Sequence, residues 1–97
     1  MAATQVEIVT PQGALFSGPA EMVTLCAEGG DIAFLANHMA YVGVLEPGEL
    51  RVVHPEGAPP GPQGTADELR FDVQGGGFVE VSANRVVVIC DAATGPL

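Results

Sequence analysis

Short runs in which apolar and polar residues alternate dominate the chain. Residues 69–74 alternate an apolar with a charged or polar side chain, and residues 5–8 and 49–52 do the same. A period of two is typical of strands that bury one face. Residues 86–90 are apolar on both faces, which predicts a central strand with covered edges. Glycine and proline interrupt the chain so often that the longest stretch free of both is 78–94, so long helices are excluded.

Turn signals separate these runs at intervals typical of sandwiches and barrels. They fall at 11–13, 18–19, 29–30, 47–48, 75–77 and 83–84. We therefore expect an all-β domain of eight to ten strands over residues 1–92, followed by a frayed tail at 93–97. Residues 54–68 hold four prolines and three glycines, which predicts a long, mobile hairpin loop between two strands. Because a strand follows Gly75–Gly77, we interpret this triplet as a tight or bulged turn with positive φ, not as a phosphate-binding loop.

Composition narrows the class of partner. The 97 residues suit a single domain, and 47% of them are apolar with only five aromatics, so the core must consist mainly of aliphatic side chains. Twelve acids against three arginines and no lysine give a net charge of −9, which disfavours nucleic acid and favours basic protein partners. The same acidity is also explained by solubility alone. The sequence contains neither a membrane-spanning apolar run nor a secretory signal, so we expect a soluble, non-exported chain.

Candidate chemistry is sparse. Cys26 and Cys90 have no nearby cysteine or histidine, and we interpret both as buried, small apolar residues, with a disulfide between them as the alternative. A Cys/His dyad or a metal site would have to combine them with His38 and His54, but no local spacing supports either. We expect no enzymatic activity, no metal and no cofactor.

The order of six short motifs is more specific than any one of them. They are Val9-Thr10-Pro11, Leu15-Phe16-Ser17-Gly18, Glu28-Gly29-Gly30-Asp31 leading to His38, Leu45-Glu46-Pro47-Gly48, Gly76-Gly77-Phe78-Val79-Glu80-Val81 and Val86-Val87-Val88-Ile89-Cys90-Asp91. In this order, across residues 5–92, they resemble the amino-terminal domain of the ε subunit of F-type ATP synthases, which is called δ in mitochondria.

The resemblance implies a flattened β-sandwich of two roughly five-stranded sheets, without the helical hairpin that follows this domain in many bacteria. It implies a non-catalytic subunit of the central stalk that binds the γ subunit and the ring of c subunits and couples proton-driven rotation to ATP synthesis. The location it implies is peripheral, on the cytoplasmic face of a bacterial energy-transducing membrane. We expect no ATP binding by this chain.

Site residues follow from the resemblance in two sets. The c-ring set is Glu28, Asp31 and His38, and the γ set is Thr10, Tyr41, Val42 and Gly43. Each set has a plainer interpretation: Asp31 as a solvated turn acid, His38 as an ordinary loop histidine, and Tyr41 and Val42 as core residues. An acidic turn on a chain without lysine suits a partner with basic loops.

Residues 36–40 depart from the family pattern. The family usually has Pro-Gly-His-Ala-Pro where this chain has Ala36-Asn37-His38-Met39-Ala40. Asn37 tolerates a left-handed backbone, so the turn before His38 can be retained. The rival hypothesis is a free-standing β-sandwich that binds a ligand or carbohydrate. It would need exposed aromatic residues for stacking and usually an export signal, and the sequence favours neither.

Overall fold

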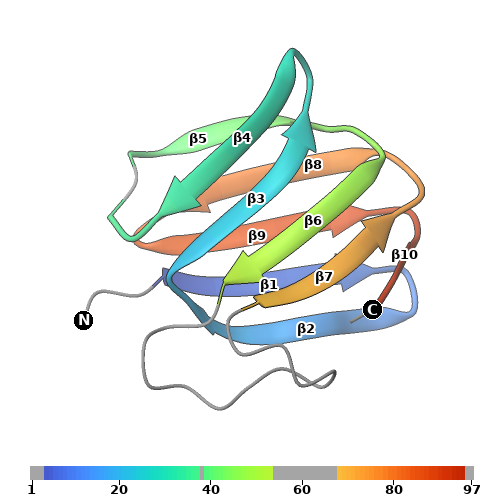
Figure 1. Ribbon diagram of the computed structural model, residues 1–97, viewed down its shortest axis with the longest axis horizontal. Coiled ribbons are helices and arrows are strands. Elements are labelled where there is room, and N and C mark those ends of the chain that lie inside the picture. Colours follow the sequence, from blue (N-terminus) through green and yellow to red (C-terminus); the bar gives the residue numbers. More distant parts are fainter. Residues whose placement is uncertain (1–3, 38, 54–67, 96–97) are drawn as a thin grey trace.

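The computed structural model describes residues 4–37, 39–53 and 68–95, and these form ten strands and no helix (Figure 1). The strands are β1 (Thr4–Thr10), β2 (Gly13–Ala20), β3 (Met22–Ala27), β4 (Gly30–Leu35), β5 (Tyr41–Leu45), β6 (Gly48–Val53), β7 (Glu68–Val73), β8 (Gly77–Ser82), β9 (Arg85–Cys90) and β10 (Ala93–Thr94). The expected all-β class and the number of strands are confirmed. The described residues include no helix that is long and apolar enough to cross a membrane.

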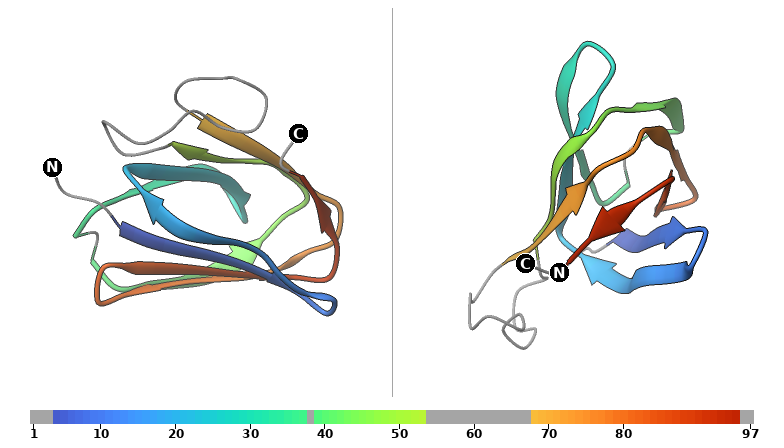
Figure 2. Two further views of the ribbon diagram at one scale, coloured as in Figure 1. Left: turned by 90° about the horizontal axis from the view of Figure 1, so that it is seen from below. Right: turned by 90° about the vertical axis from the view of Figure 1, so that its right-hand side faces the viewer.

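The strands form two five-stranded layers. One layer has the order β10-β7-β6-β3-β4 and the other β5-β8-β9-β1-β2. They are joined where β3 meets β5 through the single pair Ala27 and Leu45, and Figure 2 shows the layers stacked face to face. β1 pairs in parallel with β9, whereas the other pairs are antiparallel. The expected flattened sandwich is confirmed.

The core lies between the layers and is almost entirely aliphatic. Alternate residues of each strand point inward, as the period of two predicts: Leu69, Phe71 and Val73 are buried, and Arg70 between them is exposed. Phe16 of β2 meets Phe71 of β7 edge to face, with ring centroids 5.8 Å apart, and so connects the two layers at their other side. The strand β9 is central, between β8 and β1, as expected.

Residues with positive φ occur at two of the positions where the sequence predicts turns. Ala83 and Asn84 join β8 to β9 with φ of 50° and 59°, which is the pair of positive angles of a type I′ hairpin turn. Asn37 has φ of 63°, so the left-handed conformation expected before position 38 is present.

The expectation of positive φ in the glycine triplet 75–77 is wrong. None of its three φ angles lies in the left-handed region, and the segment is not a hairpin turn, because β7 and β8 belong to different layers. A Cβ atom on Gly77 would overlap the carbonyl oxygen of Ile89, so glycine is required there by close backbone approach.

The expected loop 54–68 and the expected tail 93–97 both contain residues that belong to strands. The expected loop 54–68 falls largely outside the described residues, but Glu68 is the first residue of β7 and pairs with Val53. The expected tail contains a short strand, because Ala93 and Thr94 pair with Val73 and Asp72 as β10.

Candidate protein-binding surfaces

A row of apolar side chains crosses the outer face of the second layer. The register places Val44, Phe78, Ile89, Val9 and Ala14 side by side on five neighbouring strands. Phe78 is 59% exposed, Ile89 51% and Val44 39%. We call these five residues the apolar row. A hollow of about 320 Å³ lies along it and is also lined by Thr10 and Pro11.

The apolar row was not predicted, although the sequence of residues 86–90 contains a signal for it. A central strand with two apolar faces buries only one of them against the opposite layer. Val86 and Val88 face the core, while Ile89 faces outward and is exposed. Contiguous exposed apolar surface of this kind marks interaction sites.

The structure divides the expected γ set between the two faces of the sheet. Thr10 borders the apolar row, and Val42 is 70% exposed on the same outer face, so its interpretation as a core residue is wrong. Tyr41 and Gly43 lie on the inward face, and the Tyr41 ring packs against Phe34 with centroids 5.4 Å apart. A Cβ on Gly43 would overlap the Tyr41 ring, so this glycine makes room for the tyrosine.

The acidic part of the c-ring set lies at the turn between β3 and β4. Glu28 is in the two-residue turn and Asp31 is the second residue of β4, and both are exposed. The Glu28 N–H donates to the carbonyl of Val44 at 3.1 Å, which places this acidic turn beside the apolar row. The backbone of the turn therefore adjoins β5, the strand at one end of the apolar row.

His38 lies outside the described residues, but its chain neighbours are at the other end of β4. β4 runs from Gly30 to Leu35, a length of roughly 17 Å, and Asn37 follows it. The Asn37 N–H donates to Asn84 Oδ1 at 2.8 Å, which ties this loop to the β8–β9 turn. The backbone carbonyl of Asn84 accepts from Gln5 N–H and from Thr4 Oγ1. The structure thus separates Asn37 from Glu28 along β4.

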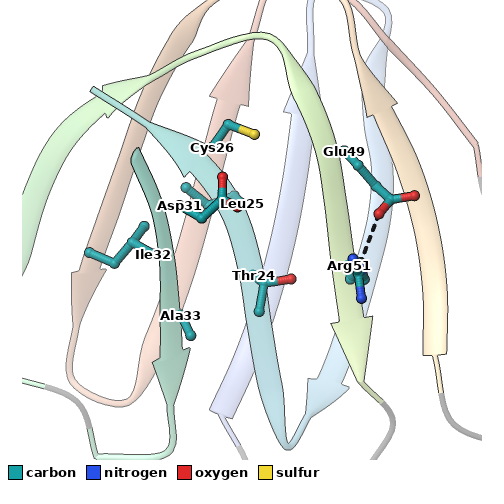
Figure 3. Close-up of a pocket in the computed structure, with 8 residues that line it drawn as sticks. All are labelled: Thr24, Leu25, Cys26, Asp31, Ile32, Ala33, Glu49 and Arg51. Atoms are coloured by element: carbon teal, nitrogen blue, oxygen red, sulfur yellow. Dashed lines mark hydrogen bonds and ion pairs between the residues drawn. The ribbon is translucent and has the colours of Figure 1, made fainter. Parts of the chain in front are cut away.

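The outer face of the first layer carries a hollow of about 330 Å³ that polar and apolar residues line together (Figure 3). Cys26 of β3, Asp31 of β4 and the ion-paired Glu49 and Arg51 of β6 line it, with Arg51 Nε 2.8 Å from Glu49 Oε1. Burial, a hydrogen bond with the Asp31 carboxylate and the charge of that carboxylate raise the pKa of the Cys26 thiol. Because a protonated thiol is a poor nucleophile and a poor metal ligand, this hollow is not suited to cysteine chemistry near neutral pH.

Both cysteines are free thiols, so the alternative of a disulfide is not realised in the structure. Cys90 is buried as expected, but Cys26 is only partly buried on the outward face of β3. Within residues 4–37, 39–53 and 68–95, no three side chains of the His, Cys, Asp or Glu type are placed to hold a metal ion.

Comparison with known proteins identifies the family. A family model described as the β-sandwich domain of the ATP synthase delta/epsilon chain matches residues 3–96. The ATP synthase epsilon chain of Dichelobacter nodosus is 33% identical over 89 residues, covering 92% of this chain and 55% of the relative. That of Bacillus pumilus is 34% identical over 93 residues, covering 96% of this chain and 63% of the relative. This chain spans 55–63% of the length of the curated relatives it matches.

Solved structures share the fold. A chain in the structure of OSCP, F1 and the c-ring of the Euglena gracilis mitochondrial ATP synthase superposes with a TM-score of 0.79 at 22% identity, covering 97% of this chain and 54% of that one. A chain in the central stalk and c-ring structure of the Tetrahymena thermophila mitochondrial ATP synthase gives 0.66 at 18% identity, covering 93% and 64%.

Proposed function

Because this chain belongs to the delta/epsilon chain family of ATP synthases through its β-sandwich domain, we propose that it is a non-catalytic subunit of the central stalk of a rotary F-type ATP synthase. In this role it binds the γ subunit and the c ring, couples rotation to ATP synthesis, and is peripheral on the cytoplasmic face of the membrane. Family membership favours this function over a free-standing carbohydrate-binding module.

The apolar row is the observation that carries the proposal. An isolated soluble domain gains nothing from keeping Phe78 and Ile89 in water, whereas a stalk subunit buries them against its neighbour. We assign γ to this row, with Thr10 at its border and Val42 beside it. Tyr41 and Gly43 support the surface from the inward side of β5.

The acidic turn suits the second partner. Glu28 and Asp31 project at the tip of the β3–β4 hairpin, which extends beyond both layers (Figure 2). Exposed acids at the rim of an interface act mainly on the rate of encounter and on its salt dependence. We assign the c ring to this turn, and His38 to the same interface on the strength of the family resemblance.

Binding kinetics with a purified complex of γ and the c ring test both assignments. Phe78→Asp should weaken binding on the order of tenfold or more, mainly through faster dissociation, because it places a charge in the apolar row. Ser82→Asp is the matched control, because it adds the same charge to the outer face of the same strand outside the row. Equal affinities for the two variants would exclude the apolar row as the γ site.

The assignment of the c ring has its own variant. Asp31→Lys should slow association, because it replaces a charge that attracts a basic partner with one that repels it. The dependence of association on ionic strength should become flatter, because less attraction remains for salt to screen; the Debye length is about 8 Å at physiological salt. Glu21→Lys changes the net charge equally at an exposed position away from the turn. If both variants change association alike, only the overall charge matters and the turn is merely solvated.

A further inference from the structure

The open edge of β4 differs from the other free edges of the sandwich. β2, β5 and β10 are the other edge strands of the two layers, and β4 pairs with β3 alone among the described strands. The edge of β5 is partly occupied, because β5 pairs with β3 at Ala27 and Leu45 and the Val44 carbonyl accepts from the Glu28 N–H. β2 carries Pro19 and its pairing with β1 is shifted by a bulge, while β10 is only two residues long. These are devices that keep an edge from pairing with another chain. β4 pairs with β3 over six residues without a shift and contains no proline and no basic residue.

The register shows which backbone groups of β4 face outward. A two-residue turn joins Ala27 to Gly30, and the pair that closes such a turn exchanges backbone hydrogen bonds. Because bonded and non-bonded pairs alternate, Ile32 and Phe34 also bond to β3. The N–H and C=O groups of Asp31, Ala33 and Leu35 therefore point away from β3. The edge of β4 toward which they point is the open one (Figure 1).

The side chains of these three residues define the chemistry beside the edge. Asp31, Ala33 and Leu35 lie on the outer face and are exposed, Leu35 by 53%. Glu28 adds a second carboxylate at the amino end of β4, and the hairpin from Met22 to Leu35 contains no lysine or arginine. A second copy of this chain would bring another net charge of −9 to the edge, so charge disfavours it as the occupant.

We infer that the β4 edge accepts an extended segment of a partner protein as an additional strand, with a lysine or arginine near Asp31 and an apolar residue near Leu35. Backbone hydrogen bonds to Asp31, Ala33 and Leu35 supply the affinity, and the side chains beside them select a basic segment. The inference does not rest on the proposed function, because it needs neither γ nor the c ring.

A peptide of alternating lysine and valine, acetylated and amidated, is the probe, and amide hydrogen exchange of the whole chain is the readout. In the free chain, Asp31, Ala33 and Leu35 should exchange faster than Ile32 and Phe34. The peptide should slow exchange at the three outward amides by about tenfold or more and leave Ile32 and Phe34 unchanged. The same peptide with glutamate in place of lysine should not protect them. Equal protection by both peptides, or binding without this pattern, would overturn the inference.

Ala33→Pro tests the backbone bonds directly. It removes an N–H that does not bond to β3, so the hairpin should persist while peptide affinity falls about tenfold. Ala33→Thr is the control that changes the side chain and keeps the N–H. Should the proline variant unfold, Ala33→Lys keeps the backbone and repels the basic probe. Unchanged peptide affinity in whichever of Ala33→Pro and Ala33→Lys remains folded would refute strand addition. If protection of the outward amides against exchange rises with protein concentration in the absence of peptide, the occupant of the edge is instead a second copy of this chain.

Discussion

The Asp31 carboxylate acts on its cross-strand neighbour, the thiol of Cys26. The two residues pair directly across β3 and β4, and their side chains share the outer face of the sheet. A carboxylate beside a thiol opposes loss of the thiol proton, which is one reason why the pKa of Cys26 is raised. A residue proposed to meet the c ring thus also keeps an accessible cysteine unreactive.

Asp31→Asn should lower the pKa of Cys26, because it removes the negative charge that disfavours the thiolate. At pH 8, alkylation of Cys26 by iodoacetamide should therefore be faster in the variant than in the parent chain. Mass spectrometry assigns the modified residue, and the rate as a function of pH gives the pKa. Glu28→Gln removes an equal charge from the same hairpin and is not among the groups that shift Cys26. Similar rates for the two variants would contradict a specific effect of Asp31.

Ala83 occupies a backbone conformation that alanine tolerates poorly. Its φ of 50° lies in the left-handed region. This conformation costs most L-residues roughly 1–2 kcal/mol, whereas glycine, asparagine and aspartate tolerate it better. Ala83→Asn should raise the free energy of unfolding by about 0.5–1 kcal/mol, since asparagine is favoured in type I′ turns. Denaturant unfolding measures the change. Ala92→Asn, at an exposed position without positive φ, should give no gain, and a similar gain there would rule out the turn as the cause.

At the scale of elements, local pattern predicted the strands better than their partners. The period of two located β7 and its inward face, because burial of alternate side chains leaves a direct trace in the sequence. The glycines at 75–77 signalled a break, but not that the chain changes layers there. That depends on contact with Ile89 and Cys90, which are distant in sequence. β10 was missed because two residues carry no periodicity.

Gly77→Ala should destabilise the sandwich strongly, because the new Cβ would overlap the backbone carbonyl of Ile89 and the central strand cannot move away cheaply. We expect a loss on the order of 3 kcal/mol or more in the free energy of unfolding. Gly76→Ala is the matched control, because its Cβ would lie 3.2 Å from the Leu45 carbonyl oxygen and needs only a small adjustment. A comparable loss in both variants would mean that flexibility, not close approach, explains the triplet.

At the scale of the whole molecule, the pairing of distant strands forms the main candidate site, the apolar row. The motif order located the acidic turn, because Glu28 and Asp31 are close in sequence and in space. The five residues of the apolar row come from five strands, and only the register brings them together. The parallel pairing of β1 with β9 completes the row, and nothing local in either strand encodes it. The sequence could therefore predict the turn acids but not the larger surface beside them.

Net charge supplies a prediction about the whole chain. Arg85 pairs with Glu7 at 2.6 Å and Arg51 with Glu49 at 2.8 Å. Both arginines and Glu49 are exposed and Glu7 is partly exposed, and ion pairs in contact with solvent contribute little. Twelve acids against three arginines leave many repulsive contacts that compaction strengthens. Salt screens attraction and repulsion alike, and at a net charge of −9 we expect repulsion to be the larger sum.

Raising sodium chloride from about 0.1 to 1 M, which shortens the Debye length from about 10 to 3 Å, should therefore raise the thermal midpoint of unfolding. Glu21→Gln removes one acid, so the net charge goes from −9 to −8, and the salt dependence should become weaker. Arg85→Gln removes one cation, so the net charge goes from −9 to −10, and the dependence should become steeper. Calorimetry at a series of salt concentrations measures all three slopes. A midpoint that falls with salt would mean that the ion pairs outweigh the repulsion. The excess of acids would then not destabilise the free chain, and a basic partner would relieve no repulsion on binding.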